Sequence, residues 1–282
     1  MKEQDLYLPG NACKQLFFRH YSANVQAKAV VALVHGYGEH SGRYSAWAER
    51  FTNRGVAFCS IDLPGHGLSS GKRGHFKSYD LVLKDIDVFL TKVNDIYPSI
   101  PIILYGHSMG GNIVINYALR RRRCFNMLIV TSPWLLLTTP IPSYLLKVVS
   151  LMSRLLPQFT VKSPLNAADL SGIPQVGKDY ISDPLNHNRV SMRLLCQVIE
   201  HGKSVIGQVY KITVPVFLAH GTDDNITSYK ASVEFVRNTS EFITLQLWEG
   251  MRHELHNDIC QDKHFETIMQ WIDIELPNVK LC

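Results

Sequence analysis

Short runs of branched apolar residues alternate with amphipathic segments along most of this chain. Six of these runs have the length of a buried strand. They lie at 29–34, 56–61, 102–105, 127–130, 214–219 and 243–248. Apolar residues between Tyr79 and Ile96 recur at steps of three and four, which predicts an amphipathic helix. Strands that alternate with helices need crossover connections, so we expect a mostly parallel α/β sheet whose functional loops follow the carboxyl ends of the strands.

Two regions depart from this alternation. The segment 16–21 is more amphipathic than the other runs, and we expect it at an antiparallel edge of the sheet. The proline-rich stretch from about 133 to 208 has one clear element, a helix predicted over 143–156, whose polar residues form a narrow stripe. Such a helix needs cover or an apolar ligand. We therefore expect a core from residues 1–133 and 209–282, interrupted by a helical cap inserted at 134–208.

Composition and charge exclude several other classes of protein. With 46% hydrophobic and 19% charged residues the chain has enough apolar material for a packed core. The net charge is +5, and the one basic cluster, Arg120 to Arg123, closes a helical pattern, where it complements the helix dipole. We expect no nucleic-acid partner. The six cysteines have neither metal-ligand nor disulfide-framework spacing, which predicts reduced thiols and no metal.

The amino terminus and the hydropathy pattern predict a cytoplasmic protein. No apolar run reaches the roughly 18–20 residues that a bilayer crossing needs, and residues 1–5 are polar, with no apolar signal-peptide core behind them. The apolar helix predicted over 143–156 adds the expectation of a peripheral membrane contact through the cap. The sequence does not indicate the oligomeric state.

A strand that runs into a short glycine-rich motif predicts the nucleophile. The apolar run at 102–105 continues into Gly106-His107-Ser108-Met109-Gly110, and a helical pattern follows at once. This is G-x-S-x-G between a strand and a helix, where small flanking residues allow the sharp turn that presents a serine hydroxyl above the sheet. The alternative interpretation is a purely structural turn. In this context the motif favours Ser108 as a nucleophile.

A serine nucleophile requires a base and an orienting acid, and both follow in the order that this motif needs. A serine hydroxyl reacts only when an imidazole takes its proton and a carboxylate holds that imidazole. The strand at 214–219 ends near Asp223 and Asp224, and the strand at 243–248 is followed by His253 and His256. His253 is favoured as the base because it comes sooner after its strand, whereas the residue types alone permit either acid. The order Ser, Asp, His is that of the α/β-hydrolases.

The loop after the first buried strand supplies the remaining requirement, an oxyanion hole. One donor is the amide of the residue after the nucleophile, Met109, and the second comes from a loop after an earlier strand. The run at 29–34 ends in His35-Gly36-Tyr37-Gly38, whose glycines let backbone N–H groups converge.

Three motifs together resemble the monoacylglycerol lipase and lysophospholipase family of α/β-hydrolases. They are HGYGEHSGRY at 35–44, DLPGHGLS at 62–69 with RGH at 73–75, and GHSMGG at 106–111. The likeness extends from about residue 15 to about 275 and is weakest in the insertion. It implies an α/β-hydrolase fold, a mostly parallel central sheet with flanking helices and an inserted cap that lines an acyl tunnel.

The resemblance also implies a set of site residues. Ser108 is the nucleophile, Asp224 the orienting acid, His253 the base, and the amides of Tyr37 and Met109 the oxyanion donors. Glu39, Arg43 and His256 are implied as polar contacts to a glycerol head group. The family often has a smaller residue in place of Tyr37, which leaves the amide unaffected and bears on head-group selectivity. An exposed ion pair four residues apart on a helix is an equal interpretation of Glu39 and Arg43.

These observations lead to the hypothesis of a cofactor-free serine esterase. The expected substrate is the ester of a single-chain lipid, foremost a monoacylglycerol, cleaved to fatty acid and glycerol. Alternatives are a lysophospholipase or a broad carboxylesterase with the same catalytic residues. A ligand-sensing protein on the same fold is a further alternative, which an intact set of catalytic residues disfavours.

Overall fold

The computed structural model describes residues 2–121, 125–237 and 242–279. Part of the basic cluster and two of the six cysteines lie outside these ranges. They are Arg122 and Arg123 of the cluster, and Cys124 and Cys282. One eight-stranded sheet organises the described part of the chain, in the strand order β1-β2-β4-β3-β5-β6-β9-β10. Its strands are β1 (Lys2–Pro9), β2 (Gln15–Ser22), β3 (Ala29–Val34), β4 (Val56–Ile61), β5 (Ile102–His107), β6 (Met127–Thr131), β9 (Val216–Gly221) and β10 (Ile243–Trp248).

Strand pairing confirms the prediction of a mostly parallel sheet. The strands from β4 to β10 are parallel neighbours, whereas β1 pairs antiparallel with β2, and β2 antiparallel with β4. The antiparallel pairing of 16–21 is confirmed, but its edge position is wrong, because β1 covers that edge. β1 could not be predicted from the sequence pattern, because its first four residues are polar, most of its described side chains are exposed, and it pairs mainly through its backbone.

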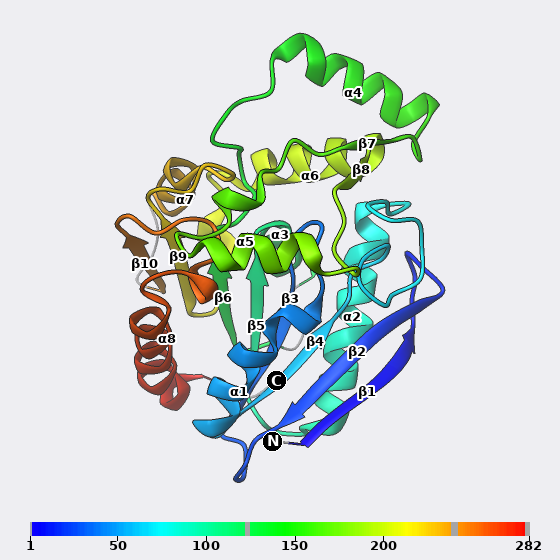
Figure 1. Cartoon of the computed structure of the whole chain (residues 1–282). Helices are drawn as coiled ribbons and strands as arrows, with labels where there is room; N and C mark the ends of the chain where they lie inside the picture. The colour runs from blue at the N-terminus through cyan, green and yellow to red at the C-terminus, as the bar shows by residue number, and fades with distance from the viewer. Residues whose placement is uncertain (1, 122–124, 238–241, 280–282) are drawn as a thin grey trace.

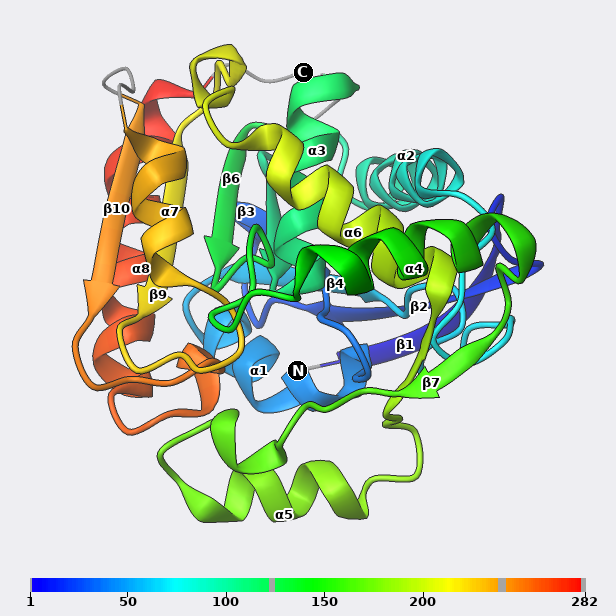
Figure 2. The same cartoon turned by 90° about the horizontal axis from the view of Figure 1, so that it is seen from above.

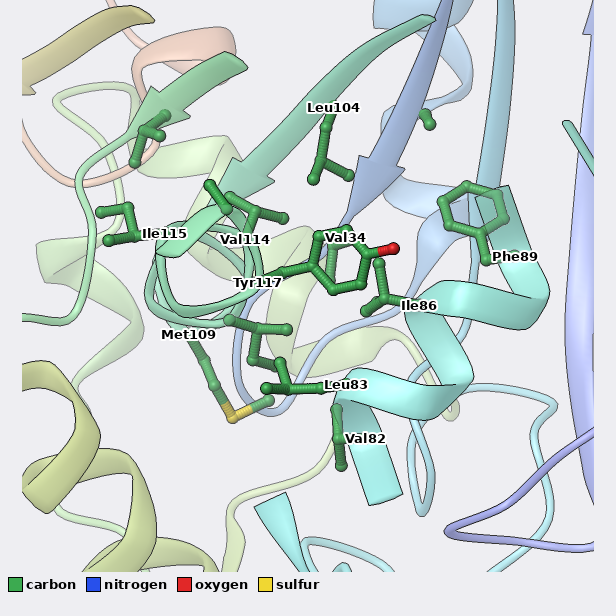
Figure 3. Close-up of a cluster of buried hydrophobic side chains, with 14 of the residues drawn as sticks. Val34, Val82, Leu83, Ile86, Phe89, Leu104, Met109, Val114, Ile115 and Tyr117 are labelled. Atoms are coloured by element: carbon green, nitrogen blue, oxygen red, sulfur yellow. The ribbon is translucent and has the colours of Figure 1, made fainter. Parts of the chain in front are cut away.

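Helices cover both faces of the sheet, as the alternation of side chains along each strand requires. One face carries Val30, Ala32 and Val34 of β3 and packs against α2 (Tyr79–Ile96), α3 (Met109–Arg120) and α7 (Tyr229–Val236). The close-up in Figure 3 shows this layer, with Ile86 and Phe89 of α2 and Val114 and Tyr117 of α3 turned toward the strands. The opposite face packs against α1 (Ser45–Asn53) and α8 (Gln261–Glu275).

The chain between β6 and β9 forms a separate group of elements at the carboxyl ends of the strands. The helix predicted over 143–156 is α4 (Ser143–Leu155), and it lies beside α6 (Met192–Val205), with α5 (Pro174–Ser182) on another edge of the group (Figures 1 and 2). Strands β7 (Thr160–Lys162) and β8 (Arg189–Ser191) form a two-stranded antiparallel sheet here. This group faces the edge of the main sheet at which β5 and β6 end.

Short 3-10 helices complete the described elements. They are η1 (Ser41–Tyr44), η2 (Ala167–Asp169), η3 (Val209–Lys211), η4 (Leu255–Asn257) and η5 (Leu276–Asn278). None of the helices in the three described ranges combines the length and the apolar composition that a bilayer crossing requires.

Candidate active site

A strained turn places Ser108 between β5 and α3. Its backbone has φ 52° and ψ −115°, a conformation that side chains other than glycine rarely adopt. The turn needs a glycine at position 110, because a Cβ there would lie 2.0 Å from the carbonyl oxygen of Val34. The strain is therefore supported by close backbone packing, and it holds the serine at the amino end of α3, as the G-x-S-x-G motif predicts.

Three predicted residues from three different strand ends form one hydrogen-bonded chain. The Oγ of Ser108 lies 2.9 Å from Nε2 of His253, and Nδ1 of His253 lies 2.7 Å from Oδ2 of Asp224. Asp224 follows β9, His253 follows β10, and all three side chains are buried. Because a carboxylate only accepts hydrogen bonds, Nδ1 of His253 carries the proton and Nε2 is left to accept from the serine hydroxyl. Asp223 is exposed on the adjacent loop.

The electrostatic environment of Asp224 and His253 favours the protonated form of the His253 imidazole. Burial alone would raise the pKa of Asp224, but His253 and His220 outweigh it and hold that pKa far below the usual value of a carboxyl. Burial alone would lower the pKa of His253, yet the charge and hydrogen bond of Asp224 raise it. A protonated His253 is therefore stabilised by a neighbouring anion.

The predicted oxyanion loop leaves both predicted donors available. The amides of Tyr37 and Met109 donate to no protein acceptor within the described ranges. The preceding amide, that of Gly36, is held by Oε1 of Glu39 at 2.6 Å. On the other side, the carbonyl oxygen of Gly38 accepts from the hydroxyl of Tyr180 at 3.0 Å and from the amide of His187 at 2.9 Å. The loop is thus held from the sheet side and from the segment between β6 and β9.

Glu39 and Arg43 form an ion pair, but the expectation of an exposed pair is wrong. Arg43 Nη1 lies 2.8 Å from Oε2 of Glu39, and the same guanidinium donates to both oxygens of Glu254 at 2.6 and 2.8 Å. The side chains of all three are at least nine-tenths buried. Burial alone would raise the pKa of Glu254, but the charge and hydrogen bonds of Arg43 outweigh it and lower this pKa to about 2.

Of the three residues implied as head-group contacts, the structure brings only Glu39 to the pocket wall. Arg43 lies behind that wall, between Glu39 and Glu254. His256 is also absent from the lining, and its ring stacks on Tyr44 with 4.5 Å between ring centroids. This arrangement presents neither Arg43 nor His256 to a ligand.

Ser108 opens onto a cavity of about 510 Å³. Ser108, His253, Tyr37 and Gly36 are among the residues that line it. Apolar side chains from the segment between β6 and β9 line much of the rest, among them Ile141, Leu145, Val161, Leu165, Leu170, Val190 and Leu195. A cavity that holds a serine–histidine pair and is lined largely by apolar side chains suits a ligand with one reactive polar group and an apolar chain.

Sequence reasoning missed two residues of this site. His220, the last residue but one of β9, donates to the carboxylate of Asp224, and its signal was a histidine four residues before the acid. Glu254 follows the base directly, but its partner Arg43 is 211 positions away, so no local spacing indicated the pair.

Comparison with known proteins identifies the family of this chain. Residues 25–259 match the family model described as serine aminopeptidase, S33. Monoglyceride lipase of Homo sapiens is 30% identical over 279 residues, which cover 95% of this chain and 90% of that protein. The crystal structure of Paleococcus ferrophilus monoacylglycerol lipase is 31% identical, has a TM-score of 0.84, and the match covers 91% of this chain and 98% of that one.

A longer relative shares the same region. An uncharacterized abhydrolase domain-containing protein of Dictyostelium discoideum is 32% identical over 268 residues, or 94% of this chain. The chain spans only 28% of the length of that relative.

A parallel sheet with a serine at a strained strand-to-helix turn, faced by a histidine and an acid from later strand ends, defines the class of α/β-hydrolases with a serine nucleophile. The chain belongs to the serine aminopeptidase S33 family of this class and, within it, to the monoglyceride lipases. The family resemblance and the fold expected from the sequence are both confirmed.

Proposed function

We propose that this chain hydrolyses the ester of a monoacylglycerol to a fatty acid and glycerol. One observation carries the proposal: the hydrogen-bonded chain of Ser108, His253 and Asp224 adjoins a cavity that Ser108 and His253 line together with many apolar side chains. The family relatives named monoglyceride lipase support the choice of substrate.

The proposed reaction proceeds through an acyl-enzyme. Ser108 Oγ attacks the acyl carbonyl carbon while His253 Nε2 takes its proton, and the amides of Tyr37 and Met109 stabilise the oxyanion. When the tetrahedral intermediate collapses, the bond to glycerol breaks and the leaving oxygen takes the proton from His253. Water then attacks the acyl-enzyme and gives a proton to His253 Nε2. When this second intermediate collapses, the bond to Ser108 Oγ breaks, Ser108 Oγ takes the proton back from His253, and the fatty acid is released. Asp224 fixes the tautomer of His253 throughout.

The test is a turnover panel combined with labelling of the nucleophile. Oleoylglycerol, oleoyl lysophospholipids and p-nitrophenyl esters of several chain lengths are compared with wild-type protein. A fluorophosphonate probe should label the wild type and fail to label Ser108→Ala, which should also lose ester turnover by several orders of magnitude. Labelling that persists in Ser108→Ala would refute the assignment of the nucleophile. Tight binding of a small ligand without turnover would favour the sensor interpretation.

The segment 134–208 acts in this proposal as a cap that also contacts a membrane. The helix α4 exposes a broad apolar face and carries the basic residues Lys147 and Arg154. Its exposed apolar residues are Tyr144, Leu145, Val148, Leu151 and Leu155. An amphipathic helix of this kind binds at a lipid surface through buried apolar area and attraction to anionic lipids.

Vesicle binding tests this contact. Wild-type protein should cosediment with vesicles that contain phosphatidylserine, and the double variant Val148→Asp/Leu151→Asp should stay in the supernatant. Turnover of a water-dissolved short-chain ester should be equal in both proteins, because neither residue lines the cavity. Equal cosedimentation of variant and wild type would remove α4 as the membrane contact.

A further inference from the structure

The lining of the cavity carries an excess of carboxylates. Among the described residues that line the cavity, Glu39, Asp169 and Glu254 are acidic, and Lys162 is the basic one. Glu39 and Glu254 are the two that adjoin the reacting groups. Glu39 holds the amide of Gly36 in the oxyanion loop, and Glu254 directly follows the base.

One arginine serves both of these carboxylates from behind the cavity wall. Arg43 donates to both oxygens of Glu254 and to Oε2 of Glu39, and its guanidinium lies 5.0 Å from the ring centroid of Tyr180. Oε2 of Glu254 also accepts from Nδ2 of Asn257 at 2.8 Å. Two negative charges therefore share one positive charge, and Arg43, held on both sides, is not offered to the cavity.

The head group of the substrate, which is the leaving group of the proposed reaction, has to lie close to the carboxylates of Glu39 and Glu254. Since His253 gives its proton to the leaving oxygen, the head group must lie against His253 and the residue that follows it, Glu254. A hydroxyl group can donate a hydrogen bond to a carboxylate there. A phosphate can only accept, carries negative charge, and would meet repulsion that little water screens.

We propose that Glu254 is a specificity-determining residue that limits this enzyme to esters with uncharged, hydroxyl-bearing head groups and excludes those that carry a phosphate beside the glycerol. This rests on the proposed function and narrows it, because it separates monoacylglycerols from lysophospholipids. Glu254 acts in two ways: it contributes a negative charge to the head-group end, and it keeps Arg43 from serving as a phosphate ligand.

The experiment compares three octanoyl esters below their micelle concentrations. They are octanoylglycerol, octanoylglycerol 3-phosphate and octanoyldiglycerol, the last being larger than glycerol but uncharged. For wild type we expect kcat/KM for the phosphate ester to be at least about 30-fold below that for octanoylglycerol, a ratio that repulsion between like charges readily supplies. Octanoyldiglycerol should stay within about fivefold of octanoylglycerol if charge rather than size decides, since one added uncharged group changes binding little.

The variant Glu254→Gln should reduce the discrimination against phosphate at least fivefold, because Arg43 is then left with a single carboxylate partner. The matched control is Glu249→Gln, which removes an exposed acid outside the cavity lining and should keep the wild-type ratio. A readout independent of folding is the wild-type ratio itself, which should fall as ionic strength rises if repulsion sets it.

The outcomes separate this inference from the proposed function. Equal kcat/KM for the phosphate ester and octanoylglycerol in wild type, with octanoylglycerol turnover present, would overturn the inference alone. An unchanged ratio in folded Glu254→Gln would do the same. Absence of turnover for octanoylglycerol and for p-nitrophenyl butyrate would instead remove the proposed function, and this inference with it.

Discussion

Nε2 of His220 lies 3.0 Å from Oδ2 of Asp224, the same carboxylate oxygen that holds His253. Because the carboxylate only accepts, Nε2 of His220 carries the proton, and its Nδ1 accepts from the hydroxyl of Ser232 at 2.7 Å. His220 and Ser232 are both fully buried. Asp224 is therefore oriented from two sides, and its position does not depend on His253 alone.

Removal of His220 should weaken catalysis without abolishing it. In His220→Ala, Asp224 loses one of its donors and holds His253 less firmly, so kcat should fall about tenfold. Fewer competing donors leave more negative charge for His253, so its pKa should rise and the acid limb of the pH profile should move to higher pH. His220→Gln, which keeps a donor, should recover part of the rate. An unchanged pH profile in a folded His220→Ala would contradict this positioning role.

Substitutions of the two adjacent aspartates, Asp223 and Asp224, should differ by orders of magnitude in their effect on kcat. Asp224→Asn removes the charge that fixes the tautomer of His253, and kcat should fall by about 10⁴-fold. Asp223→Asn changes an exposed side chain and should be nearly silent. Steady-state kinetics with p-nitrophenyl butyrate decides between them. An essential Asp223 beside a dispensable Asp224 would reverse the assignment.

The pH dependence of kcat/KM should follow the neutral form of His253. Asp224 raises the pKa of this imidazole above its ordinary value, and only the unprotonated ring accepts the serine proton. Activity should therefore be lost as pH falls through that raised pKa, and the acid limb should lie above about 6.5. In Asp224→Asn the raising charge is absent, so the limb of the residual activity should move to lower pH. A limb that does not move would show that Asp224 does not set the pKa of the base.

Loss of Arg43 should destabilise the fold far more than loss of a surface arginine. Arg43→Gln leaves the buried carboxylates of Glu39 and Glu254 without their cation, which should cost about 3–5 kcal/mol in urea unfolding at neutral pH. The control is Arg54→Gln, whose partner Glu266 is exposed, and its cost should stay below about 1 kcal/mol.

Acid should diminish the difference between Arg43→Gln and wild type. The pKa of Glu254 is lowered to about 2 in the folded protein, so its pairing stabilises the fold above the unfolded pKa of about 4.3 and is lost as pH falls toward 2. In urea unfolding, the difference in free energy of unfolding between Arg43→Gln and wild type should be smaller at pH 3 than at pH 7. An equal difference at both pH values would mean that Arg43 stabilises the fold through packing rather than charge.

Leu145 should influence chain-length preference because it lines the cavity. Leu145→Asp places a charge against the expected acyl chain, so kcat/KM for long-chain monoacylglycerols should fall at least tenfold, with acetate esters little affected. Leu151→Asp, on the exposed face of the same helix, is the matched control for dissolved substrates. Equal losses on long and short esters would indicate destabilisation of the fold instead.

The parts that the sequence predicted are those that local patterns encode. The buried strands, the helix Tyr79–Ile96 and the positions of Ser108, Asp224 and His253 follow from periodicity and from the rule that parallel strands end at one edge. The four-residue spacing of Glu39 and Arg43 likewise indicated a real pair. The spacing did not indicate that this pair is buried. Its burial depends on Glu254, which the fold brings to Arg43 from the other half of the sheet. β1 was not predicted for a different reason: it is held by backbone pairing with β2, which places few requirements on its side chains.

The carbonyl of Gly38 joins the oxyanion loop to the inserted segment. Tyr180 and His187 both donate to it from the segment between β6 and β9. A chimaera that imports a foreign segment at 134–208 without the hydroxyl of Tyr180 and a backbone N–H placed as that of His187 would leave this carbonyl unpaired. Grafts intended to change acyl selectivity should therefore keep Tyr180 and the backbone path at 187 and vary the apolar lining around them, so that turnover number and substrate range can be altered independently.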